Sequence, residues 1–174
     1  DLERSKVADS LIFRDGEELA ATILNESFNL RTAYADLKIE RRWIAGIDLG
    51  AAAGTIESVI TVNSNRFSGF LSDSTFVVRL SDGTRKEVRR EKVLKAVFRI
   101  QETELDGTPR NQFVFLKNGD FFTGKIMNES LVIVSKTNRV SIRPSEITSA
   151  TFVAESTPFA RIRLLNGDVV QGLP

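Results

Sequence analysis

Apolar and polar residues alternate in short runs along the chain, and a glycine-containing turn separates many of these runs. In FVFLKNGDFFTGKI (113–126) the alternation breaks at Asn118-Gly119, a pair that accepts positive φ and is typical of a tight hairpin. The segment GEELAATILNES (16–27) by itself also fits an amphipathic helix, because Glu, Leu and Ala favour helices. Its counterpart GDFFTGKIMNES (119–130) does not, so the pattern predicts strands at both places.

The counterpart exists because the chain repeats itself. ILNESFNL begins at Ile23, and IMNESLVI begins 103 residues later at Ile126. A third copy lies between them, 48 residues after the first, and ARIRLLNGDVVQGLP at the end starts the pattern again. In these copies Gly69, Gly124 and Gly172 correspond to Ala21. Internal repetition is the stronger explanation for apolar positions that stay aligned over such a length.

Each repeat reads as short strands with a single helical turn before the last strand, which ends at Phe152 in the third repeat. Five short, bent strands fit a small closed barrel without exposed edges. Because units of about 40 residues are marginal alone, we expect neighbouring barrels to pack together or to swap strands. We therefore expect an all-β protein of three tandem five-stranded SH3-like or Sm-like barrels and a hairpin that begins a fourth repeat. The expected domains are residues 8–52, 58–100, 112–153 and, for the hairpin, 159–174.

Two details of this arrangement are testable. Tiny residues at the positions of Gly124 and its counterparts predict that another backbone comes close there. The Asn-Glu-Ser segments are interpreted as polar turns between the second and third strands. The 159–174 hairpin alone would be barely stable, so we expect it to dock on a barrel of this chain or a neighbour, with Ile162, Leu164 and Val170 facing inward.

Composition narrows the function. Of 174 residues, 41% are hydrophobic and 27% are charged, which is ordinary for a core-forming protein, and the formal net charge is +1. Because Cys and His are absent, thiolate sites, disulfides and histidine chemistry are excluded. The carboxylates Asp15, Glu17 and Glu18 are expected at a water-exposed hairpin tip, and Asp120 at the equivalent tip, which disfavours acid–base catalysis at both places. We expect no enzyme, no cofactor, no metal site and no transmembrane segment.

The third repeat resembles the Sm-like fold. Lys117, Asn118, Gly119 and Gly124 match the opening hairpin and second strand of that family, and Ile142, Arg143 and Ile147 match its ending. Pro144 stands where the family has glycine, and no Asp-x-x-x-Asn pair precedes the third strand. Since the missing residues are among those that hold RNA bases in Sm proteins, the resemblance implies the fold more than RNA binding.

The segment LRTAYADLKIERRWIAGI (30–47) is similar to a bacterial envelope module with the pattern LKNGD…GxI…LxLxTxYAxLxIxxxxIxxI. That module occurs in secreted proteins and ahead of salt-stress-induced outer-membrane barrels. The resemblance implies an extracytoplasmic, periplasmic or envelope-associated module without catalytic activity. A cytoplasmic location is the alternative.

Two surface sets are candidate binding residues. A basic run forms a candidate patch for an anionic partner: Arg85, Lys86, Arg89, Arg90, Lys92 and Lys95. A solvated strand face is the plainer interpretation of this run, because no aromatic residue interleaves it for base stacking. Arg41, Arg42 and Trp43 form a candidate interface, since the equivalents of Trp43 are Lys92 and Glu146 and indicate an exposed place. A Trp43 that lies on its own barrel is the plainer interpretation.

We therefore expect a non-enzymatic binding or scaffold segment of a larger bacterial envelope protein, acting through protein–protein contact or self-association. Sm-like RNA binding through the basic middle repeat is the alternative, and it is the less favoured of the two.

Overall fold

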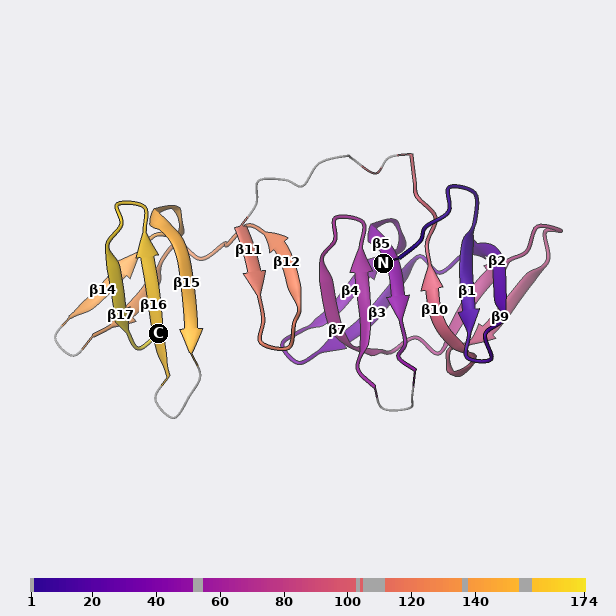
Figure 1. The fold of residues 1–174 in the computed structure, drawn as a ribbon, viewed down its shortest axis with the longest axis horizontal. Coiled ribbons are helices and arrows are strands. Elements are labelled where there is room, and N and C mark those ends of the chain that lie inside the picture. The colour runs from indigo at the N-terminus through magenta and orange to yellow at the C-terminus, as the bar shows by residue number, and fades with distance from the viewer. Residues whose placement is uncertain (1, 52–54, 103, 105–111, 136–137, 154–157) are drawn as a thin grey trace. The chain divides into compact units, whose positions relative to one another are not determined.

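The chain is all-β and forms two compact units, residues 1–124 and 125–174 (Figure 1). The computed structural model describes residues 2–51, 55–102, 104, 112–135, 138–153 and 158–174. Within this part the helical elements are three single 3₁₀ turns, η1 (Arg41–Trp43), η2 (Arg90–Lys92) and η3 (Pro144–Glu146). Each turn directly precedes the fifth strand of a repeat, so the expected helical turn is confirmed.

The strands follow the repeats. Repeat 1 contains β1 (Asp9–Phe13), β2 (Glu18–Ile23), β3 (Ser27–Thr32), β4 (Asp36–Glu40) and β5 (Ile44–Asp48). Repeat 2 contains β6 (Glu57–Thr61), β7 (Arg66–Leu71), β8 (Thr75–Arg79), β9 (Arg85–Arg89) and β10 (Val93–Val97). Repeat 3 contains β11 (Gln112–Phe115), β12 (Phe121–Gly124), β13 (Leu131–Val134), β14 (Arg139–Ile142) and β15 (Ile147–Val153). The fourth repeat opens with β16 (Phe159–Leu164) and β17 (Val169–Gly172). The strand expected around residues 16–27 is confirmed as β2.

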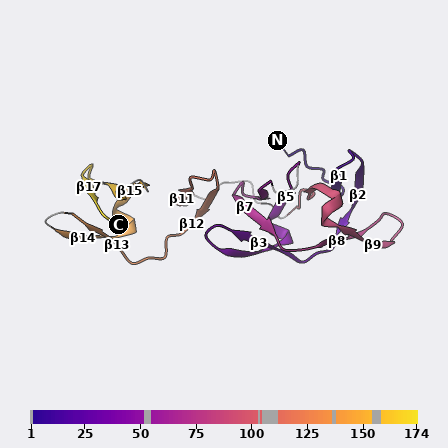
Figure 2. The same ribbon diagram turned by 90° about the horizontal axis from the view of Figure 1, so that it is seen from below.

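Repeats 1 and 2 exchange strands. Strand β2 of repeat 1 pairs with β8 of repeat 2, and β7 of repeat 2 pairs with β3 of repeat 1. The first two strands of each repeat therefore complete the last three strands of the other. We call β1, β2, β8, β9 and β10 group A, and β3 to β7 group B. Figure 2 shows β8 and β9 beside β1 and β2, although they belong to different repeats.

The exchange is made at the connections between second and third strands. The Asn25 side chain donates to the Thr75 carbonyl at 3.1 Å and accepts from the Val77 backbone N–H at 2.8 Å. Asp73, the equivalent of Asn25 in repeat 2, accepts from the backbone N–H of Asn29 at 2.7 Å. Each connection thus bonds the third strand of the other repeat. The Asn-Glu-Ser segment of repeat 1 is a crossing connection rather than the turn that the sequence indicated.

The two groups meet across β5 and β10 with local twofold symmetry. Ile47 pairs with Ala96, its own equivalent in repeat 2, and the neighbouring residues pair symmetrically about them. A single buried cluster fills both groups, with Phe28, Phe76 and Phe98 as its largest fully buried side chains. Phe28 lies 5.5 Å from Phe76 and 5.9 Å from Phe98 between ring centroids. One shared core therefore stabilises the exchanged arrangement.

A buried carboxylate in the first strand of repeat 1 and another in the first strand of repeat 2 hold these strands in place through hydrogen bonds and ion pairs. Asp9 accepts from the backbone N–H groups of Ile23 and Arg99, and its carboxylate lies 3.1 Å from the Arg41 guanidinium. Glu57 holds the equivalent place in β6 and lies 3.3 Å from Arg90. Burial of a carboxylate is tolerated because each one is both hydrogen-bonded and ion-paired.

In the second unit, β15, β16 and β17 form one sheet, and β13 and β14 form another. A bridge between Val134 and Leu173 joins β13 to the end of β17. We call β13 to β17 group C; its core contains Ile133, Ile142, Ala160 and Ile162. The expected docking of the 159–174 hairpin is confirmed: Ile162 is fully buried, and Leu164 and Val170 pack against the same core.

Two expectations need correction, and one repeat position differs in burial between the units. The expectation that each repeat closes on itself is not confirmed, because β2 and β7 pair with third strands of the other repeat. A close backbone approach exists at Gly69, beside the Arg31 carbonyl, and at Gly172, beside the Val134 carbonyl, but Gly124 has open space where a Cβ would lie. Phe152 is 52% exposed, whereas its equivalents Leu49 and Phe98 are buried.

Candidate functional site

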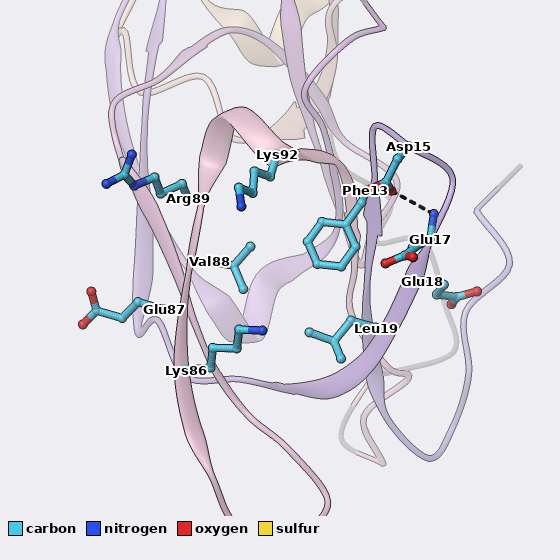
Figure 3. A pocket seen from close by; sticks show the side chains of 10 residues that line it. All are labelled: Phe13, Asp15, Glu17, Glu18, Leu19, Lys86, Glu87, Val88, Arg89 and Lys92. Carbon is cyan, nitrogen blue, oxygen red and sulfur yellow. Dashed lines mark hydrogen bonds between the residues drawn. The ribbon is translucent and has the colours of Figure 1, made fainter.

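Group A carries a groove of about 500 Å³ at the tip of the β1–β2 hairpin (Figure 3). We call it groove A. Phe13, Leu19 and Val88 face its middle, from β1, β2 and β9. Phe13 and Leu19 are half-buried, and Val88 is buried. An apolar floor of this kind fits an apolar side chain of a binding partner.

The rim of groove A has two sides of opposite charge. Asp15, Glu17 and Glu18 line the hairpin side, where the Asp15 carboxylate accepts the Glu17 backbone N–H at 3.1 Å. The amines of Lys86 and Lys92 turn into the hollow from the other side, while Glu87 and Arg89 point away from it (Figure 3). A rim with both charges fits a polar protein segment better than a polyanion, because a polyanion would meet the carboxylates.

Group B carries the equivalent groove, of about 490 Å³, which we call groove B. Its lining residues are Lys38, Ile39, Glu40, Trp43, Thr61, Asn63 and Asn65. Each of them is the repeat equivalent of a groove A residue; Trp43 corresponds to Lys92, and Asn65 corresponds to Glu17. The two grooves are therefore one feature of the repeat, expressed once in each group.

The β11–β12 hairpin lies along the flank of groove B. Phe121 pairs with Arg66 of β7, and Asn65 accepts from both the backbone N–H and the hydroxyl of Thr123, at 3.0 and 3.2 Å. The Phe122 ring stacks on Phe67 at 5.5 Å between centroids. Group B thus already holds a β-hairpin through a strand edge, an aromatic contact and side-chain hydrogen bonds.

A Tyr–Asp hydrogen bond adds to this contact. The expectation that Asp120 is open to water is wrong, because Asp120 is 1% exposed beneath Tyr34. The Tyr34 hydroxyl, in the β3–β4 turn, donates to the buried Asp120 carboxylate at 2.9 Å, and the Asn118 amide donates to the same oxygen. Burial works to raise the pKa of Asp120, but hydrogen bonds from Ser68, Asn118 and Tyr34 outweigh it, so its pKa is lowered. Partial burial, followed by the hydrogen bond to Asp120 and its charge, raises the pKa of Tyr34 to about 12.

The structure divides the candidate patch for an anionic partner. Arg90 is engaged with Glu57 and the Leu71 carbonyl, and Lys95 lies 3.5 Å from Asp48. Arg85, Lys86, Arg89 and Lys92 are exposed on β9 and η2 and form no ion pair within the described residues. Of the six residues of this candidate patch, these four remain as unpaired surface cations in the described part of the chain, and three of them, Lys86, Arg89 and Lys92, line groove A.

The candidate interface is also divided. Arg41 is half-buried against Asp9 and therefore has a structural contact. Arg42 pairs with Glu40 at 2.8 Å, and its guanidinium lies 5.4 Å from the centre of the Trp43 ring. Trp43 is 53% exposed and lines groove B, so the exposed place indicated by its repeat equivalents is confirmed.

Sequence reasoning missed the residues that hold the β11–β12 hairpin, above all Tyr34, Asn65, Asp120, Phe122 and Thr123. The available signal was the aromatic content of FVFLKNGDFF, which exceeds that of the equivalent segments of the other repeats. Phe113 and Phe115 occupy positions that carry Arg161 and Arg163 in β16. Their contact partners depend on the chain crossing, which alternation alone does not reveal.

No protein-family model, curated protein or solved structure matches the chain. Among the described residues no group of three acidic, His or Cys side chains is arranged to hold a metal ion. The same part of the chain contains no helix with the length and apolarity needed to cross a bilayer. The site must therefore be interpreted from its own geometry.

Proposed function

We propose that this chain is a non-enzymatic binding and scaffold segment of a larger bacterial envelope protein, acting through protein–protein contact. One observation carries the proposal: group B holds a β-hairpin beside groove B, and group A presents the same groove with the half-buried Phe13 and Leu19 at its floor. Groove A then binds a β-hairpin or strand of a protein partner, with Leu19 in the place that Phe67 has in group B. Addition of a strand to an open edge is a common mode of peptide recognition.

The fold expectation supports this function. We infer that each group is a small SH3-like or Sm-like barrel, because all three groups place their strands in the order five, one, two, three, four. A 3₁₀ turn links the fourth strand to the fifth in each. Closed barrels leave hairpin tips and short edges as binding surfaces. The extracytoplasmic location rests on the resemblance to the envelope module and on the absence of cysteine, which suits an oxidising compartment.

A pull-down from a bacterial envelope extract tests the proposal. Three baits are compared: the chain itself, a Leu19→Asp variant that puts a charge on the floor of groove A, and an Ala20→Asp control. Ala20 is the exposed neighbour of Leu19 and points to the opposite face of β2.

We expect the chain and the control to retain a common protein that Leu19→Asp loses. Retention of no protein, or of the same proteins by all three baits, contradicts binding through groove A. Circular dichroism of Leu19→Asp checks that the loss does not come from unfolding.

RNA binding is the second candidate function, and the four exposed cations Arg85, Lys86, Arg89 and Lys92 are the observation in its favour. Its test is RNA retention at low salt by the chain and by a Lys86/Arg89/Lys92→Ala variant, which spares the structural Arg90. Retention that falls steeply with salt and disappears in the variant favours this function. Absence of retention at about 50 mM salt removes it.

A further inference from the structure

The β11–β12 hairpin is the one hairpin of the described chain whose second strand lacks a third-strand partner. Three others are completed: β2 pairs with β8, β7 with β3, and β17 is bridged to β13. The register is the same each time, because Thr22↔Arg79, Phe70↔Arg31 and Leu173↔Val134 are equivalent pairs. The three available sets of third to fifth strands are thus already in use.

The free edge of β12 is defined by its pairing with β7. Phe121 and Arg66 are repeat equivalents, so these two second strands meet at their beginnings with local twofold symmetry. The end of β7 pairs with β3 from Gly69 to Leu71. The equivalent end of β12 begins at Gly124, and there the place of a Cβ is open, whereas at Gly69 and Gly172 it meets a third-strand carbonyl. Gly124 is therefore small enough for a third strand to come close, but within the described residues no strand lies there.

The second unit, taken by itself, leaves a matching place open. Strand β5 lies between β6 and β10, whereas within the described residues β15 pairs with β16 alone. Ala150 and Phe152 of β15 are exposed, although their equivalents Ile47 and Leu49 are buried. The residue types of β15 fit a fifth-strand neighbour such as β10.

We propose that β12 binds the third strand of a segment built like β8–β9–η2–β10, that is, the third to fifth strands of a fourth repeat. The order of its elements defines this occupant: an alternating apolar strand, a hairpin to the next strand, a 3₁₀ turn and a further apolar strand. Reciprocal exchange predicts it, because β16–β17 occupies in group C the place that β6–β7 has in group B. The surface is separate from groove A, so the two proposals stand or fall independently.

The test adds the proposed binding segment to the C-terminus of the same chain. A copy of residues 72–100 is appended after Pro174, since Pro174 takes the place of Leu71 in the repeat. Thr22 pairs with Arg79, so the corresponding pair in the extended chain is Lys125 and the appended copy of Arg79. Cysteines at these two positions are the only ones in the chain, because the sequence contains none. A control extension has the same residues in scrambled order.

We expect oxidation to form one intramolecular disulfide in the extended chain and not in the control. Amide exchange of Met127 should slow by at least about 10-fold in the extended chain without cysteines, because its repeat equivalents Leu24 and Ser72 donate to third-strand carbonyls. Gly124→Val should abolish both effects in the extended chain, while it leaves the stability of residues 1–174 unchanged. Absence of the disulfide and of protection in a folded extended chain overturns the proposal.

A second measurement needs no extension. In residues 1–174 alone, amide exchange at Met127 should be fast and independent of protein concentration. Protection that grows with concentration would show that a second copy of the chain occupies the edge, and it overturns the assignment to a fourth repeat.

Discussion

The β16–β17 and β11–β12 hairpins have the same place in the repeat but different surroundings. In β16 the inward residues Ala160 and Ile162 are fully buried, and Gly172 of β17 lies against the Val134 carbonyl. In β11 the outward residues Phe113 and Phe115 are 53% and 76% exposed, and Val114, the equivalent of Ile162, is half-exposed. The difference shows that the first two strands of a repeat are buried only where the last three strands of another repeat pack against them.

The largest expected difference between the two hairpins is at their glycines. Gly172→Val should cost about 3 kcal/mol of unfolding free energy, because the new side chain meets backbone atoms that cannot move aside. Gly124→Val should cost close to nothing. Denaturant unfolding followed by circular dichroism measures both, and the single Trp43 reports separately on the first unit. Equal losses would break the comparison.

The next effect is at the inward position of the first strand. Ile162→Ala should destabilise the second unit by about 2–4 kcal/mol, since it leaves a cavity in a closed core. Val114→Ala should cost less than about 1 kcal/mol, because Val114 is already half-exposed. Hydrogen exchange resolved by residue measures each loss. A costly Val114→Ala would show that β11 belongs to a closed core.

Arg90→Ala tests the ionic fastening of a completed hairpin, β6–β7. Removal of the guanidinium leaves the Glu57 carboxylate buried without its ion pair, and we expect a loss of about 1–3 kcal/mol in the first unit. Arg89→Ala, beside it and exposed, should cost less than about 0.5 kcal/mol. Thermal unfolding followed by Trp43 fluorescence compares them, and similar losses would refute the structural role of Arg90.

The smallest effect concerns the docking of β11–β12. Tyr34→Phe should weaken it by about 1 kcal/mol, since it removes the hydrogen bond to Asp120. The raised pKa of Tyr34 means that the folded state holds this proton more tightly than the unfolded chain, whose value is 10.0. This contribution is complete below about pH 10 and is lost as pH rises through about 12.

The lowered pKa of Asp120 acts at the other end of the pH scale. Its contribution is present above the ordinary carboxyl value of 3.8 and is lost as pH falls through the lower folded-state value. Exchange of the β12 amides against pH measures both limbs. Tyr34→Phe should remove the loss of protection at alkaline pH. An unchanged alkaline loss would show that another group causes it.

Much of the fold follows from the sequence alone. Alternation around Asn118-Gly119 and the equivalence of Ile23 and Ile126 predict the strands, the hairpins and the repeat boundaries. The small size of each unit predicts that neighbouring barrels pack together or exchange strands. Which of the two occurs does not follow, because Thr22 has the same local sequence whether it pairs with Arg31 of its own repeat or with Arg79 of the next. Local pattern determines which face of a strand is buried, while the choice between equivalent partners depends on the shared core.

The candidate site follows only in part. The exposure of Trp43 could be predicted from its equivalents Lys92 and Glu146. The exposure of the cations of β9 could be predicted because so many basic residues follow one another there. The engagement of Arg90 and Arg41 was not readable, because their partners Glu57 and Asp9 lie 33 and 32 residues away. Groove A likewise depends on Phe13 and Val88, which come from different repeats and meet only after the exchange.

Disulfide formation between engineered cysteines tests the strand exchange most directly. Thr22→Cys with Arg79→Cys places two cysteines at paired positions of β2 and β8, and the chain contains no other cysteine. Thr22→Cys with Arg31→Cys is the matched control, because Arg31 is the equivalent of Arg79 within repeat 1. We predict rapid intramolecular oxidation of the 22/79 pair and none of the 22/31 pair. Oxidation of the 22/31 pair instead would show that each repeat closes on itself and would contradict the account.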